Sequence, residues 1–140
     1  DFGGHSLYGS IDMQGYDNLS ESVYRSGEFM EFEATTLSVL GKNIPIGGGG
    51  YLRLFPWLLM KTLISRHLKK NDLYVLYIHP FELSQLQVPA VPKSTSALTK
   101  FRYSYGRHKV VDKIKRLVDL LHSNGYSFTT LSEIQKEQTL

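Results

Sequence analysis

The sequence contains no cysteine, which excludes disulfide bonds and thiolate metal sites and leaves the cellular compartment open. It also lacks an unbroken apolar run of the ~20 residues that a membrane helix needs. The densest apolar stretch, residues 52–64, is interrupted by Arg53, Pro56 and Lys61. Neither sign of charge dominates, because the formal net charge is +3 and the basic residues are spread along the chain. We therefore expect no transmembrane segment and no nucleic-acid partner.

The composition that remains is that of a folded domain. Hydrophobic residues make up 41% of the 140 residues and charged residues 21%, which is typical of a globular protein. This length suits one hydrophobic core, so we expect a single domain over residues 1–140, with residues 1–28 as a loop-rich lead-in. The chain starts with Asp1 rather than methionine, so we expect that the natural N-terminus lies further upstream.

Apolar periodicity and turn residues predict an alternation of strands and helices. We expect strands over residues 29–36, 73–80 and 126–129, helices over residues 54–68, 107–123 and 131–137, a glycine-rich break over residues 41–50, and a long loop over residues 83–100. Thr130 and Glu133 have the spacing of a capping box at the start of the last helix. This order predicts an α/β fold with parallel strands and helices packed outside them.

His79 is the first candidate for chemistry, because it ends the most apolar predicted strand and active sites of α/β folds lie at the carboxyl ends of strands. Glu82 follows three residues later, where a turn would bring its carboxylate near the imidazole. A histidine in such a place suits general acid or base catalysis. By position alone, a half-buried histidine that satisfies a backbone group remains an equal alternative.

Several segments together carry a resemblance to a known family. They are GGGGYLRLFPWLL (47–59), YIHPFEL (77–83), FRYSYG (101–106), the helix KIKRLVDLL and YSFTTLSEI (126–134). In this order they resemble the C-terminal region of NodB-type polysaccharide deacetylases, which belong to the carbohydrate esterases. The resemblance covers about residues 29–134, and residues 1–28 match only loosely.

The resemblance implies that the chain is the parallel-strand C-terminal half of a distorted (β/α) barrel. Such enzymes are hydrolases that remove N-acetyl groups from a polysaccharide or oligosaccharide, using a divalent metal, usually zinc, together with an Asp base and a His acid. His79 would be the general acid, and Glu82 would orient or tune it. The family's Asp-Asp and His-x-x-x-His motifs do not occur here, so we assign no metal ligand and no cofactor to this chain. We expect the isolated chain to be inactive.

The resemblance also implies a set of residues that line the sugar groove. These are Gly48, Gly49 and Gly50 with the neighbouring Gly47, then Tyr51 and Arg53, and, after the long loop, Arg102 and Tyr103 with the neighbouring Tyr105. Glycines would let the sugar approach closely, tyrosine rings would stack on it, and Arg53 would hold a carboxylate or orient the catalytic Asp. The alternatives are glycines that serve only turns, and aromatic rings that pack only on the domain.

Two other functional classes stay open. One is a binding or structural module, in which an incomplete barrel holds a glycan or a partner without chemistry. The other is an independent small α/β fold with an unrelated function. Because half a barrel leaves strand edges unpaired, we also expect pairing into a homo-oligomer. The resemblance implies a bacterial protein of the cytoplasm or cell envelope, with a role in making cell-surface polysaccharide.

Overall fold

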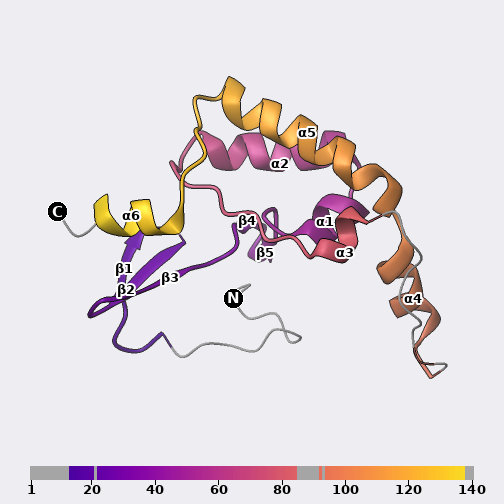
Figure 1. Cartoon of the computed structure of the whole chain (residues 1–140), viewed down its shortest axis with the longest axis horizontal. Helices are drawn as coiled ribbons and strands as arrows, with labels where there is room; N and C mark the ends of the chain where they lie inside the picture. Colours follow the sequence, from indigo (N-terminus) through magenta and orange to yellow (C-terminus); the bar gives the residue numbers. More distant parts are fainter. Residues whose placement is uncertain (1–12, 21, 85–91, 93, 138–140) are drawn as a thin grey trace.

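The computed structural model describes residues 13–20, 22–84, 92 and 94–137. Its strands are β1 (Asp17–Ser20), β2 (Val23–Ser26), β3 (Phe29–Phe32), β4 (Leu37–Val39) and β5 (Lys42–Ile44). Its helices are α1 (Gly49–Leu54), α2 (Trp57–Leu68), α3 (Pro80–Leu83), α4 (Ala97–Ser104), α5 (Arg107–Ser123) and α6 (Leu131–Glu137). Figure 1 shows α2 and α5 side by side, with α1 and α3 near one end of the pair and the β1–β3 sheet and α6 towards the other. The fold is mixed α/β.

Both sheets of the described chain are small and antiparallel, with strand orders β1-β2-β3 and β4-β5. In the second sheet Val39 faces Lys42 across a two-residue turn, in which Leu40 has φ 51° and Gly41 has φ 74°. Positive φ at both central residues is typical of a type I′ hairpin, whose twist matches that of its strands. The expected break over residues 41–50 therefore starts with a strand.

The strand expected over residues 29–36 is shorter and pairs differently. It ends at Phe32 as β3 and is antiparallel to β2, with Val23 opposite Phe32 and Ser26 opposite Phe29. The described part of the lead-in contains β1 and β2, while residues 1–12 lie outside the described residues. The alternating apolar pattern indicated a strand, but it does not show that the strand pairs with β2, because that pairing depends on the turn between them.

The single helix expected over residues 54–68 is in fact two helices. Phe55 is extended, with φ −82° and ψ 146°, because the ring of a following proline clashes with a helical residue before it. Helix α1 therefore ends before Phe55, and α2 starts after Pro56, which is its N-cap. This break separates a short helix near His79 from the long helix of the core.

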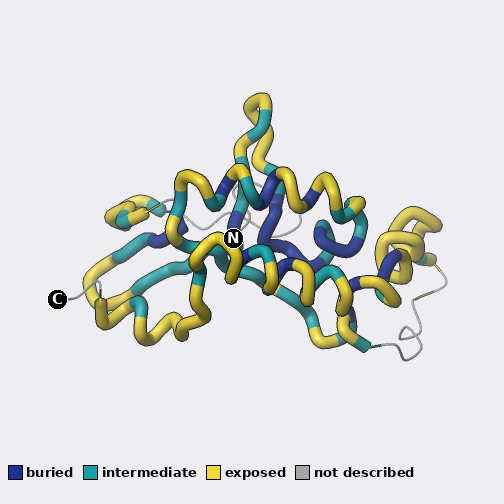
Figure 2. The backbone as a smooth tube through the Cα atoms, turned by 90° about the horizontal axis from the view of Figure 1, so that it is seen from above, coloured by how far each residue is buried: buried dark blue, intermediate teal, exposed yellow. Residues whose placement is uncertain are grey.

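Helix α5 spans the expected residues 107–123 and ends before Gly125, which has φ +83° and stops the helix in the left-handed conformation. It packs against α1, α2 and α3, and its apolar stripe contributes Leu117 and Leu121 to the core. The buried cluster consists of Ile46, Leu52, Met60, Leu63, Ile64, Leu117 and Leu121. Figure 2 shows this buried part of the chain running through the middle of the molecule, with exposed residues on the outer faces.

Residues 73–80 were expected to form a buried strand in a parallel sheet, but Pro80 begins helix α3 and residues 73–78 show much less pairing. The N–H of Tyr77 donates to the carbonyl of Gly47 at 2.8 Å, and the N–H of Gly49 donates to the carbonyl of Tyr77 at 2.9 Å. These two bonds make an isolated parallel bridge between Gly48 and Tyr77. Among the described residues it is the only parallel pairing, and they close no barrel.

Thr35 adds further hydrogen bonds to the edge of residues 73–78 that pairs with the glycine segment. Its N–H donates to the carbonyl of Val75 at 3.1 Å, its carbonyl accepts from the N–H of Gly47 at 2.7 Å, and its hydroxyl accepts from the N–H of Val75 at 2.7 Å. One edge of residues 73–78 is thus paired. Backbone hydrogen bonds to described residues are missing at the alternate positions Tyr74, Leu76 and Ile78. A ladder cannot form because the other edge has no neighbour in the part of the chain that the structure describes.

The C-terminal third corrects two further expectations. Residues 126–129 form no strand. The loop expected over residues 83–100 ends earlier than expected, because helix α4 begins at Ala97. Residues 85–91 and 93 of that loop lie outside the described residues. The predicted capping box is confirmed, because Thr130 Oγ1 accepts from the N–H of Glu133 at 3.2 Å and Glu133 Oε2 accepts from the N–H of Thr130 at 2.9 Å. In the described chain, no helix has both the length and the apolarity required to cross a membrane.

Candidate functional site

His79 lies at the carboxyl end of residues 73–78 and is the N-cap of α3. Pro80, which lacks an N–H and has a helical φ, starts the short helix directly after it. The turn is closed from both sides, because the N–H of His79 donates to Glu82 Oε2 at 3.1 Å and the N–H of Glu82 donates to the carbonyl of His79 at 2.9 Å. The imidazole is half-buried, so a rigid backbone presents a ring that solvent reaches.

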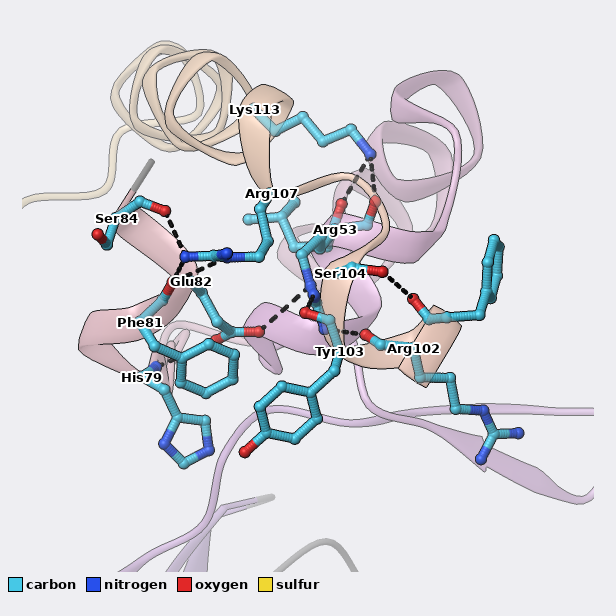
Figure 3. Close-up of polar contacts among 12 residues, drawn as sticks. Arg53, His79, Phe81, Glu82, Ser84, Arg102, Tyr103, Ser104, Arg107 and Lys113 are labelled. Carbon is cyan, nitrogen blue, oxygen red and sulfur yellow. Dashed lines mark hydrogen bonds and ion pairs between the residues drawn. The ribbon is translucent and has the colours of Figure 1, made fainter. Parts of the chain in front are cut away.

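Glu82 was expected to approach the imidazole, and the structure places its carboxylate elsewhere. The carboxylate binds the backbone N–H of His79 and lies 3.6 Å from Nε of Arg53. The Glu82 side chain is only 2% exposed. Figure 3 shows the carboxylate pointing towards Arg53, with the imidazole on the other side of the turn. Glu82 therefore acts on His79 through the backbone of the turn.

Arg53 was expected to contact sugar, but its guanidinium is buried and bound to the protein. Nη1 donates to the carbonyl of Tyr103 at 2.7 Å, and Nη2 donates to the carbonyl of Arg102 at 2.6 Å. Burial lowers the pKa of Arg53, and the neighbouring Glu82 partly counteracts this. Arg53 thus joins the end of α4 to the His79 turn. The Arg102 side chain points away from His79 in Figure 3 and is exposed, and this residue contributes its carbonyl to the site.

The glycines were expected to admit a sugar, and at two of them the close neighbour is the protein itself. A Cβ on Gly47 would overlap the carbonyl oxygen of Val75. A Cβ on Gly49 would overlap Glu82 Oε2 and stand 2.8 Å from Cγ1 of Ile78. These contacts favour the structural alternative for both residues. Gly48 is buried as the N-cap of α1, whereas Gly50 is half-buried and a Cβ there would lie 3.9 Å from Glu82.

A row of aromatic rings flanks the imidazole. The His79 ring lies 4.8 Å from that of Tyr77, edge to face, and 5.5 Å from that of Phe81, stacked. Phe81 in turn stacks on Tyr103 at 5.1 Å, with the planes 10° apart. Tyr77 is 48% exposed and Tyr103 39%, so the row has accessible rings at both ends. Tyr51, which was expected to stack on sugar, packs instead against Phe55 at 5.5 Å.

Two cations of α5 that the sequence did not single out hold this site together. Arg107 donates from Nε and Nη2 to the carbonyl of Phe81, and from Nη2 to the carbonyl of Ser84. Lys113 Nζ donates to three carbonyls at the end of α1, those of Leu52, Arg53 and Phe55 at 2.9, 3.0 and 2.6 Å. Burial lowers the pKa of Lys113, with a smaller contribution from Lys109. In the sequence, both residues stand among the polar positions of the helix over residues 107–123, and no local pattern marks these contacts.

The described residues contain no group of three or more His, Cys, Asp or Glu side chains that could hold a metal ion. The site that the described residues form brings one imidazole beside aromatic rings, and such a group can transfer a proton to or from a bound molecule. His67, the one buried histidine of the described chain, belongs to the core, where its Nε2 lies 3.0 Å from the carbonyl of Leu73.

Comparison with known protein families finds a match. The family described as "Domain of unknown function (DUF3473)" matches residues 3–136, which is nearly the whole chain. Neither a curated protein nor a solved structure matches it.

Proposed function

The chain belongs to this family of domains of unknown function, and from that premise we propose that it is the C-terminal part of a metal-dependent polysaccharide deacetylase. The family is associated with C-terminal regions of polysaccharide deacetylases. Its match includes the segments GGGGYLRL and HPFE, on which the resemblance rests. In this proposal the chain is one part of a (β/α) barrel, and the divalent metal, zinc, is held by residues outside it.

The observation that carries the proposal is the position of His79. Its strand-like segment lies parallel to the glycine segment at the Gly48–Tyr77 bridge, so the imidazole stands at the carboxyl end, where α/β enzymes place their chemistry. The half-buried ring has accessible tyrosine rings nearby, and the backbone that carries it is bound to Glu82. A general acid requires a backbone that holds it in a fixed position and a ring that the substrate can reach.

In the proposed reaction, water adds to the carbonyl carbon of an N-acetyl group, and the C–N bond then breaks to give acetate and a free amine. The bound metal would activate the water. His79 donates a proton to the departing nitrogen, because an unprotonated nitrogen would have to leave as a strongly basic anion. Tyr77 and Tyr103 offer flat apolar faces on which a sugar ring can rest. Arg53 and Glu82 keep the turn in place and do not touch the substrate.

The test is a substitution in the complete parent enzyme. His79→Ala should lower kcat on an N-acetylated glycan by roughly 10²–10⁴, the range for a lost general acid or base, while metal content and circular dichroism stay unchanged. His122→Ala is the matched control, because His122 is exposed at the end of α5, and it should leave kcat unchanged. Near-normal turnover of His79→Ala at every pH would refute the assignment.

The second candidate is a glycan-binding module without chemistry, and the exposed rings of Tyr77 and Tyr103 favour it. It differs from the first in one measurable way. If the chain only binds glycan, Tyr103→Ala should weaken binding of an acetylated oligosaccharide, and His79→Ala should leave the turnover of the parent enzyme intact.

A further inference from the structure

A groove lies on another part of the surface. It runs between Phe55 and Pro56, which link α1 to α2, and the first half of α5. Its volume is about 560 Å³. One wall carries Phe55, Pro56 and Trp57, and the other carries Tyr105 and the polar face of α5. Arg53 lines it as well, and in the view of Figure 3 Lys113 and His79 lie on opposite sides of Arg53. The groove is therefore distinct from the aromatic row around His79.

The α5 wall of the groove is one stripe of charged side chains. Lys109, Asp112, Lys113 and Arg116 follow each other at spacings of three, one and three residues, which places them on one face of the helix. Lys113 is bound to the carbonyls that end α1. The side chains of Lys109 and Arg116 make no hydrogen bond or ion pair within the described residues, although Asp112 lies between them in the stripe. The groove thus contains two cationic groups free to bind a ligand.

The groove also offers aromatic surface beside these charges. Tyr105 is 49% exposed, and the half-buried Trp57 lines the same groove from the facing wall. Lys109 and Arg116 are separated by seven residues, or roughly 10 Å along the helix, so a single small anion cannot satisfy both. A chain of sugars with repeated acid groups can do so, and its rings can rest on the tyrosine and tryptophan.

We propose that this groove binds a polysaccharide segment that carries carboxylate groups, with Lys109 and Arg116 pairing with two acid groups and Tyr105 stacking on a sugar between them. The proposal rests on the proposed function in one respect, since it names the charge class of the glycan that a deacetylase of this kind would handle. It does not depend on the chemistry of His79, because the groove residues play no part in proton transfer.

The experiment measures binding of the full chain to two matched probes by titration calorimetry: an oligogalacturonate and a neutral chito-oligosaccharide of equal length. The acidic probe should bind more tightly, and added salt should weaken it because salt screens exposed charges. Lys109→Ala/Arg116→Ala should weaken binding of the acidic probe about 2- to 30-fold, the range for the loss of two exposed ion pairs. Tyr105→Ala should weaken binding of both probes.

The matched control is Lys115→Ala/Arg66→Ala, which removes the same two kinds of charge from exposed positions outside the groove. It should change the affinity less than about twofold. Equal binding of both probes, no binding of the acidic one, or equal losses in the two double variants would overturn the proposal. The proposed function fails separately, because His79→Ala in the parent enzyme tests turnover and should leave binding of oligogalacturonate unchanged.

Discussion

Replacing Glu82 by glutamine should destabilise the fold, because it leaves the charge of Arg53 buried without a counter-charge. The Arg53 and Glu82 side chains are 6% and 2% exposed, and their charged atoms lie 3.6 Å apart. At an effective dielectric constant of ~20, that distance corresponds to roughly 4–5 kcal/mol of attraction before desolvation is counted. Glutamine keeps the shape and can still accept from the N–H of His79, so the loss is mainly the charge.

The net cost should be about 2–4 kcal/mol. Breaking a buried ion pair from one side typically costs ~3–5 kcal/mol, and relief of the desolvation of Glu82 together with the retained hydrogen bond reduces this. Arg53 also keeps its two bonds to the carbonyls of Arg102 and Tyr103, which limits how far the guanidinium can move away from the neutral amide. The His79 turn should become more mobile as a result.

The assay is urea unfolding of the full chain followed by circular dichroism. Glu82→Gln should lower the free energy of unfolding by the stated amount, whereas Glu137→Gln, an exposed carboxylate on α6, should leave the unfolding midpoint unchanged. A cycle with Arg53→Met and the double variant should give a coupling energy of at least ~1 kcal/mol. A cost for Glu82→Gln below ~0.5 kcal/mol, or a coupling energy of zero, would refute the reasoning.

Two further predictions follow from the same region. Gly49→Ala should destabilise the chain by about 1–3 kcal/mol, because its Cβ would overlap Glu82. Gly50→Ala should stabilise it by about 0.5–1 kcal/mol, because alanine suits a helix and its Cβ would make only an ordinary contact with Glu82. Thermal unfolding of both variants decides this, and equal shifts would contradict the packing described. One edge of residues 73–78 has no partner among the residues that the structure describes, and we expect it to promote association. Light scattering should then show oligomers at high concentration, and a strictly monomeric chain would disprove this use of the edge.

The sequence located His79 but not the neighbours that define its surroundings. The apolar run before it and the proline after it place the residue at the end of an extended segment, and both are local features. Arg107 and Lys113, which bind the backbone near the site, lie 23 to 61 residues away from their acceptors. No periodicity or spacing records such contacts, because a polar side chain on a helix looks the same whether it meets water or a distant carbonyl.

The amino-acid order by itself determined the elements whose signals are complete within a few residues. Helix α5 follows from its apolar stripe and the glycine that ends it, and α6 follows from the capping box of Thr130 and Glu133. Only the tertiary structure decided which strand edges pair and that Glu82 faces Arg53. It also decided that Gly47 and Gly49 lack side chains because neighbouring residues of the protein occupy the space. The physical reason is range: a helix satisfies its backbone hydrogen bonds within four residues, whereas a strand or a buried charge needs a partner that folding alone brings near.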